Sequence, residues 1–365
     1  MKHRIIPIFI PHLGCPFNCI FCDQNRITSQ YQVPSAADVI DTIDEYLATF
    51  PRGSNKVEVA FYGGSFTAVD KKEQDKYLRA VSSYLNTAEI SNIRISTRPD
   101  CIDCDTLRFL KERGVGTIEL GVQSLDDGVL RECRRGYTQE DVVRACRLVR
   151  EENFKLGIQL MIGLPGDSYT TAMETTAKVI SLKPDMVRIY PTLIIKGTFL
   201  ESMFRDGSYA SLDLQDAIRI SRNMFLQFQR AKIKVIRMGL QPSEELCNPD
   251  TVVAGPFHPS FGELVEQEVF KDQACQAIEA FFGSDGFFRE LKIFVHKKDI
   301  SKMVGYKRCN IHYLCDRFTL KNISVHACES VERDCVGIGN NAASVPEKVL
   351  TRREFCSKGD YYSCK

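Results

Sequence analysis

Six short apolar runs alternate with helical segments over the first two hundred residues, and this alternation constrains the fold more than any other feature of the 365-residue sequence. Most of the runs are near-continuous in Ile, Val and Phe, which is typical of parallel strands buried on both faces. Between them, Thr138 and Asp141 form a capping-box-like helix start, and Gly114 ends the helix before the fourth run. The expected strands are residues 5–10, 57–62, 93–97, 117–122, 156–162 and 186–191.

Strand–helix alternation of this kind produces either a doubly wound sheet or a barrel. Six units are too few for a closed eight-fold barrel, which takes about 250 residues. The sequence therefore predicts an α/β fold built on a partial (β/α)6 barrel, with a smaller C-terminal α+β lobe. The predicted domains are a partial barrel over 1–240, an extension or linker over 241–285, a small basic lobe over 286–330 and an irregular tail over 331–365.

Three cysteines, Cys15, Cys19 and Cys22, follow the first predicted strand with the spacing C-x3-C-x2-C. Three thiolates on one loop can hold three irons of a cubane cluster, whereas Fe–S clusters normally take four cysteines. A substrate or cofactor is therefore expected to complete the site. A structural zinc site would need four nitrogen or sulfur ligands. The three cysteines are one ligand short of such a site, and His12 is the only nearby residue that could supply the fourth. The spacing therefore favours a cluster over zinc.

The composition is that of a globular protein with a sizeable core, with 44% apolar and 26% charged residues and a formal net charge of +1. A neutral chain is not an overall electrostatic binder of nucleic acid, so any basic surface must be local. No signal peptide precedes the 15 cysteines, and no apolar run is long enough to span a membrane. We therefore expect a reducing, cytoplasmic location and no membrane contact. Whether Cys101 and Cys104 form a second metal site stays open.

Glycine and polar motifs stand where the later strands are expected to end. Gly63-Gly64-Ser65 follows the second strand, and small residues there let a ligand lie against the backbone. Residues 96–100 and 121–124 end the third and fourth strands. Because the carboxyl ends of barrel strands meet at one face, these motifs are expected to surround one site.

The cysteine spacing, the aromatic Phe21 before the last cysteine and these strand-end motifs together resemble the signature of radical S-adenosylmethionine (radical SAM) enzymes. The resemblance implies a [4Fe–4S] cluster on Cys15, Cys19 and Cys22, with S-adenosylmethionine chelating the open iron. Reductive cleavage would then give a 5′-deoxyadenosyl radical that abstracts hydrogen from the substrate. The cofactor-binding residues implied by the resemblance are Phe21, Gly63, Gly64, Ser65, Ser96, Gln123, Arg135 and Gln159.

Arg135 is expected to bind the cofactor's carboxylate, because a guanidinium fork can bind both oxygens. A solvated surface charge is the alternative for this residue. The candidates for the substrate side, which the sequence does not order, are Lys196, Tyr190 and Arg98.

Residues 96–100, 119–124, 135–138 and 190–198 are similar to segments in the catalytic subunit of Elongator, which modifies the wobble uridine of tRNA. The likeness covers about residues 1–210. Elongator has a longer gap between its first two cluster cysteines and a following acetyltransferase domain, for which we find no acetyl-CoA loop here. The oxygen-independent coproporphyrinogen oxidase group adds a fourth cysteine at the position of Gln24, which argues against that group.

The C-terminal lobe has a predicted β-α-α-β order that resembles the K-homology (KH) RNA-binding module, which clamps nucleotides on a GXXG loop. Arg308 replaces the second glycine of that loop. Residues 291–327 contain eight Lys or Arg against two Asp, and such a patch supplies phosphate affinity. The alternative is a small α/β extension with a solvated basic face. The candidate RNA-binding residues are Lys302, Gly305, Lys307 and Arg308.

The sequence thus favours a radical SAM enzyme that acts on RNA, with tRNA as the expected substrate and a reductant such as flavodoxin or ferredoxin as electron donor. Two alternatives stay open. One keeps the radical chemistry but assigns a small-molecule or protein substrate. The other is a non-catalytic RNA-binding Fe–S protein.

Overall fold

The computed structural model describes residues 4–17, 19–51, 57–87, 89–285 and 289–357. The chain divides into two compact units. The first unit comprises Met1–Ala217 and Ile233–Pro259, and the second comprises Ile218–Lys232 and Ser260–Lys365. Within the described residues, no helix combines the length and the apolar character needed to cross a membrane.

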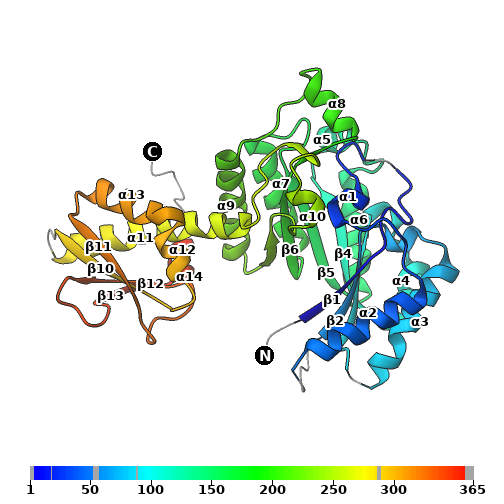
Figure 1. Ribbon diagram of the computed structural model, residues 1–365, viewed down its shortest axis with the longest axis horizontal. Coiled ribbons are helices and arrows are strands. Elements are labelled where there is room, and N and C mark those ends of the chain that lie inside the picture. The colour runs from blue at the N-terminus through cyan, green and yellow to red at the C-terminus, as the bar shows by residue number, and fades with distance from the viewer. Residues whose placement is uncertain (1–3, 18, 52–56, 88, 286–288, 358–365) are drawn as a thin grey trace. The chain divides into compact units, whose positions relative to one another are not determined.

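The first unit is a curled, fully parallel sheet of seven strands whose spatial order follows the chain (Figure 1). The predicted partial α/β barrel is confirmed, and β8 adds a seventh strand after the six expected ones. The strands are β1 (Arg4–Phe9), β2 (Val57–Tyr62), β3 (Asn92–Thr97), β4 (Val115–Gln123), β5 (Lys155–Ile162), β6 (Met186–Pro191) and β8 (Lys234–Met238).

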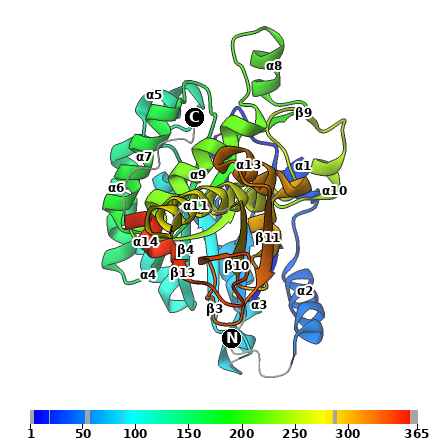
Figure 2. The same ribbon diagram turned by 90° about the vertical axis from the view of Figure 1, so that its left-hand side faces the viewer.

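Helices connect the strands and cover the outer face of the sheet (Figures 1 and 2). Capping boxes fix three of their starts, between Ser35 and Asp38, between Thr138 and Asp141, and between Ser168 and Thr171. The helical elements of this unit are α1 (Gln24–Thr28), α2 (Ala36–Thr49), η1 (Phe66–Ala68), α3 (Lys71–Asn86), η2 (Pro99–Cys101), α4 (Cys104–Glu112), α5 (Asp127–Glu132), α6 (Gln139–Glu151), α7 (Tyr169–Leu182), α8 (Phe199–Arg205) and α10 (Glu244–Cys247). Two short strands, β7 (Ile194–Ile195) and β9 (Val252–Ala254), pair antiparallel beside the sheet. Helix α9 (Leu214–Arg230) runs from the first unit into the second.

The second unit is a four-stranded sheet in the order β11-β10-β12-β13, packed on the long helix α11. Its strands are β10 (Glu290–Val295), β11 (Asn322–Ala327), β12 (Val336–Asn340) and β13 (Lys348–Leu350), and its further helical elements are α11 (Phe261–Asp285), α12 (Ile300–Val304), η3 (Tyr306–Arg308), α13 (Cys309–Phe318) and α14 (Arg352–Ser357). The β-α-α-β order from β10 to β11 matches the predicted order, and these two strands are parallel.

The structure divides the C-terminal part of the chain differently from the prediction. Residues 241–259 belong to the first unit, and α11 is part of the second unit's core rather than a linker. Residues 336–357, predicted within an irregular tail, form β12, β13 and α14. The reason is that Val336 and Ile338 are fully buried in the core against α11, while β12 pairs with β10. The rest of the predicted tail, residues 358–365, lies outside the described residues.

The inner face of the seven-stranded sheet carries a buried charge network instead of an aliphatic core. Arg94 on β3 donates to Glu58 at 2.6 and 3.0 Å and to Glu119 on β4. Arg188 on β6 donates to the same Glu119 at 2.7 and 3.1 Å. The side chains of Arg94, Glu58 and Glu119 are at most 6% exposed. The network therefore ties four strands together across the interior.

We expect Arg94→Met to lower the free energy of unfolding by about 3–5 kcal/mol, because it leaves two buried carboxylates without their shared cation. Urea unfolding followed by circular dichroism measures this change. Arg108→Met is the matched control, since Arg108 pairs with Asp105 on the surface with both side chains more than two-thirds exposed. That pair should contribute less than about 1 kcal/mol. Equal midpoints for the two variants would contradict a structural role of the network.

Candidate functional site

A cavity of about 700 Å³ runs along the inner face of the sheet towards the carboxyl ends of its strands. Its size is in the range of ligand-binding sites in proteins. Residues from all seven strands or the loops after them line it, and so do the three cysteines of the loop that follows β1. The motifs expected to surround one site therefore meet at one cavity.

The loops after β1 and β2 are in direct backbone contact. The amide of Ser65 donates to the carbonyl of Leu13 at 3.0 Å. A Cβ on Gly64 would lie 2.3 Å from that carbonyl oxygen, and a Cβ on Gly14 would lie 2.4 Å from the carbonyl oxygen of Ser65. Gly14 also has a φ of 75°, which favours glycine. Only glycine at these two positions lets the cysteine loop pack this closely on the second strand end.

All three cysteines of the loop are free and partly exposed to the cavity. Burial and then the neighbouring Cys19 raise the pKa of Cys22 to about 12 and raise that of Cys15 as well. Cys22 accepts a hydrogen bond from the side-chain amide of Gln24 at 3.2 Å. Within the described ranges, no three His, Cys, Asp or Glu side chains are arranged to hold a single metal ion.

His12, the candidate for a fourth zinc ligand, is already engaged. Its Nε2 accepts a hydrogen bond from the backbone amide of Gln24 at 2.8 Å, and it lies 3.8 Å from Asp23. The lone pair on this nitrogen is therefore used to fix the turn that begins α1. This contact adds to the argument from spacing against zinc.

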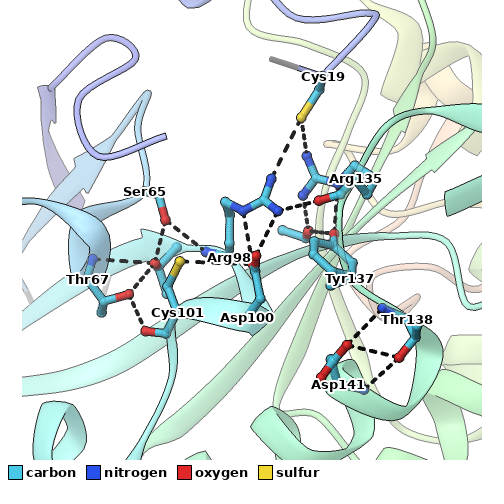
Figure 3. A network of polar contacts seen from close by, with 12 residues as sticks. Cys19, Ser65, Thr67, Arg98, Asp100, Cys101, Arg135, Tyr137, Thr138 and Asp141 are labelled. Carbon is cyan, nitrogen blue, oxygen red and sulfur yellow. Dashed lines mark hydrogen bonds and ion pairs between the residues drawn. The ribbon is translucent and has the colours of Figure 1, made fainter. Parts of the chain in front are cut away.

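Two arginines reach the central cysteine of the loop (Figure 3). Arg135 donates to Cys19 Sγ at 2.8 Å, to the carbonyl of Gly121 at 2.7 Å and to the Tyr137 hydroxyl at 2.8 Å. Arg98 makes a longer contact of 3.9 Å with the same sulfur. Both guanidinium groups are almost fully buried. The alternative that Arg135 is a solvated surface charge is therefore wrong.

Arg98 was expected on the substrate side, but the structure places its guanidinium beside the cysteine loop. It binds Asp100 through two hydrogen bonds of 2.9 Å and also donates to the carbonyl of Arg135. Its guanidinium carbon lies 4.9 Å from the Phe17 ring centre and 5.1 Å from that of Tyr137. Cation–π contacts of this kind stabilise both partners. Arg98 thus connects the loop to the helix start near Tyr137.

The structure brings together most of the predicted cofactor-binding residues. The members that line the cavity are Phe21, Gly63, Gly64, Ser96, Gln123, Arg135 and Gln159. Ser65 is buried behind the wall, with its hydroxyl 3.0 Å from that of Thr97. Gln123 has a φ of 67° where the β4–β5 ladder shifts register. A non-glycine residue in this conformation stores strain, which is common at functional sites.

The structure places the predicted substrate-side residues Tyr190 and Lys196 at different sites. Tyr190 lines the cavity and accepts a hydrogen bond from Arg188 at 3.3 Å. Lys196 does not line it, because it lies exposed after β7, where its backbone amide pairs with Thr251. The cavity residues that the sequence interpretation missed include four polar or charged side chains on the strands, and the alternation of polar with apolar residues in those strands could have revealed them. They are Tyr62, Glu119, Arg188 and Arg237.

Cys101 and Cys104 line a separate surface depression with Asp100 and Asp103. Cys104 is exposed, and burial raises the pKa of the Cys101 thiol. Within the described part of the chain, these side chains do not form a group that could hold a metal ion.

In the second unit, the loop before α13 exposes Lys307 and Arg308, both with positive φ values of 50° and 62°. Gly305 is buried beneath them. Lys302 is partly buried and forms an ion pair with Glu266 on α11, so it is not part of the exposed loop surface. Arg317 and Lys321 also face carboxylates, which makes the local basic excess smaller than the sequence indicates.

Comparison with known families gives two adjoining matches. Residues 9–179 match the model of the radical SAM superfamily, and residues 184–271 match the model of the radical SAM C-terminal domain. A tRNA uridine(34) acetyltransferase from Methanocaldococcus jannaschii is 29% identical over 245 residues, which cover 56% of this chain and 45% of that protein.

Elongator complex protein 3 from Bos taurus is 26% identical over 253 residues, which cover 58% of this chain and 46% of that protein. The chain therefore spans about half the length of these curated relatives. Among solved structures, the archaeal Elp3 of Methanocaldococcus infernus with an N-terminal deletion superimposes with a TM-score of 0.59 at 22% identity, covering 73% of this chain and 62% of that one. This likeness supports the fold.

We expect Gly64→Ala to lower the thermal midpoint of the protein, because overpacking of this kind costs about 1–3 kcal/mol. The new Cβ would lie 2.3 Å from the Leu13 carbonyl oxygen, which cannot move without shifting the cysteine loop. Gly283→Ala is the control, since Gly283 lies exposed in α11 with nothing within 4 Å of its added Cβ. That change should leave the midpoint equal or raise it. A Gly64→Ala midpoint equal to the wild type would refute the close packing.

Proposed function

This chain belongs to the radical SAM superfamily, and we propose that it uses radical chemistry to modify an RNA, with tRNA as the substrate class. Enzymes of this superfamily use a [4Fe–4S] cluster and S-adenosylmethionine, whose reductive cleavage supplies a 5′-deoxyadenosyl radical for hydrogen abstraction. The observation that carries the proposal is the meeting of Cys15, Cys19 and Cys22 with the strand-end motifs at one cavity.

The residues present fit these cofactors. Three cysteines on one loop supply three of the four thiolates that a cluster takes, and they leave one iron for another ligand. Arg98 and Arg135 place positive charge beside Cys19, where it would offset the charge of the thiolate. Hydrogen bonds to cluster sulfurs are among the features that set cluster potentials.

The cofactor's polar groups have matching partners on the cavity wall. Gly63 and Gly64 present backbone without side chains. Ser96, Gln123 and Gln159 offer hydroxyl and amide groups suited to ribose hydroxyls, and Gln159 donates to Gln123 at 3.4 Å. Arg135 donates to Cys19 through Nη1 and to Gly121 through Nη2, and the second hydrogen on each of these nitrogens is suited to a carboxylate. The apolar Phe21 covers the cysteine loop and limits water near the reacting atoms.

Two observations support RNA as the substrate. The relatives that match the first unit include proteins named for acetylation of tRNA uridine 34. In addition, the loop of Lys307 and Arg308 exposes two cations between α12 and α13, the position of the nucleotide-clamping loop in the KH-like order. We further propose that a one-electron donor such as flavodoxin or ferredoxin reduces the cluster, and that the enzyme works in the cytoplasm.

The reaction is tested with protein reconstituted anaerobically with iron and sulfide and supplied with dithionite and S-adenosylmethionine. We expect 5′-deoxyadenosine to form, to rise when bulk tRNA is added, and to fall to background in Cys19→Ala. The last effect follows because the remaining two cysteines cannot hold three irons.

The product is quantified by liquid chromatography, and iron content is measured in parallel. If 5′-deoxyadenosine forms but tRNA does not change its amount, the result would favour a small molecule or a protein as the substrate. A loaded cluster that forms no product would refute the radical enzyme and favour an RNA-binding Fe–S protein.

We expect the double variant Lys307→Gln/Arg308→Gln to weaken tRNA binding uniformly across tRNA sequences. If both cations contact phosphate, the slope of log affinity against log salt should fall by about 2. Filter binding at several salt concentrations measures it. Lys321→Gln, which removes a lysine 79% exposed at the start of β11, is the control and should leave the slope within error. An unchanged slope in the double variant would show that Lys307 and Arg308 do not contact the phosphates of the RNA.

A further inference from the structure

A row of polar side chains crosses the inner face of the sheet below the strand ends. Gln159 on β5 pairs in register with Arg188 on β6, and Arg188 pairs in register with Arg237 on β8. All three line the 700 Å³ cavity. The row therefore presents two guanidinium groups side by side to the same enclosed space.

The charges of this inner face do not balance. Glu58 and Glu119 are the two carboxylates of the network, and they face the three cations Arg94, Arg188 and Arg237. Arg94 and Arg188 bind these carboxylates directly. Arg237 donates only through Nε, to the carbonyl of Gly239 at 3.0 Å, and no carboxylate contacts it in the part of the chain that the structure describes.

An unpaired cation on the partly buried wall of a cavity lowers the stability of the fold, because burial penalises a charge that has no partner. Burial lowers the pKa of Arg237, and the like charge of Arg188 lowers it further. A guanidinium nevertheless remains charged near neutral pH. Within the described residues, Arg237 is therefore a charged group on the cavity wall without a carboxylate partner, and perturbed charged groups in a cleft are typical of functional sites.

We propose that Arg237 binds an oxyanion of the substrate, a phosphate or a carboxylate, at the inner face of β6 and β8. Nη1 and Nη2 of Arg237, which bond to no other residue that the structure describes, supply a fork that can bind two oxygens. The Tyr190 hydroxyl accepts a hydrogen bond from Arg188 at 3.3 Å and has its own proton to donate. Gln159, in register with Arg188, borders this position and donates its amide to Gln123. One bound monoanion would balance the charges of the five side chains counted above, which are two carboxylates and three guanidinium groups.

This site rests on the proposed function only in naming the anion as part of the substrate. The binding itself requires no turnover. Arg237 is not proposed to act as a nucleophile or an acid. Its role is to bind the substrate's anion and so fix the substrate's orientation in the cavity.

The test is anaerobic isothermal titration of the reconstituted protein with inorganic phosphate and, separately, with acetate, at constant ionic strength set by chloride. The wild type should bind at least one of the two anions with a stoichiometry of one. Arg237→Gln should weaken that binding about tenfold or more, the expected loss for a charge-assisted hydrogen bond. Preference for phosphate would assign the substrate's anion as a phosphate, and preference for acetate would assign it as a carboxylate.

Arg205→Gln is the matched control, since Arg205 is an exposed arginine that pairs with Glu201 on α8. It should bind both anions as the wild type does. Arg237→Lys keeps the charge but loses the fork, and it should bind between the wild type and Arg237→Gln; it also serves if the glutamine variant does not fold. Absence of anion binding to the wild type, or affinities unchanged by both substitutions of Arg237, would overturn the site.

The outcome is separable from that of the radical chemistry. A protein that binds an anion through Arg237 but never forms 5′-deoxyadenosine would refute the proposed function and support the site. If the protein forms 5′-deoxyadenosine but substitutions of Arg237 leave its anion affinity unchanged, only the anion site is refuted.

Discussion

The shared carboxylate of Glu119 is the interaction on which the first unit depends. It receives hydrogen bonds from Arg94 on β3 and Arg188 on β6, and so links strands on both sides of β4. The interior of a small barrel is normally filled by layers of branched apolar side chains. Here charged side chains occupy the lower layer and must keep their geometry to remain paired. Glu119 and Arg188 of this layer also line the cavity, so the interior contains a polar-walled space rather than a fully packed core.

A second constraint acts on the cysteine loop, which has little regular secondary structure of its own. Its position comes from Gly14 and Gly64 packing backbone against backbone, and from Arg98 held between the rings of Phe17 and Tyr137. These contacts orient the loop through side chains from the third strand end and from the start of α6. A loop held at these points keeps its three cysteines at the cavity wall, and fixing a binding segment beforehand reduces the entropic cost of binding.

The sequence predicts the parts of this structure that depend on local chemistry. The cysteine spacing, the glycines after β2 and the capping box of Thr138 were each readable from neighbouring residues. The inner charge network was not found, because the runs were interpreted as continuous apolar strands although Glu119 and Arg188 alternate with apolar residues. Strand β12 was missed because its sequence, from Val336 to Asn340, is short and contains two glycines, so its burial depends on tertiary contacts with α11, β10 and β13.

The open side of the barrel explains why the unpaired charge lies on β8. The strands β1 and β8 are the two edges of the sheet, and both contribute to the cavity, β1 through Ile5 and Pro7 and β8 through Arg237. Proline is tolerated there because an edge strand leaves part of its backbone without a ladder partner. A cation at the other edge stands where a ligand can enter without crossing the sheet. An acidic residue placed there would neutralise Arg237 permanently, whereas an unpaired arginine leaves that role to a ligand that arrives with its own negative charge.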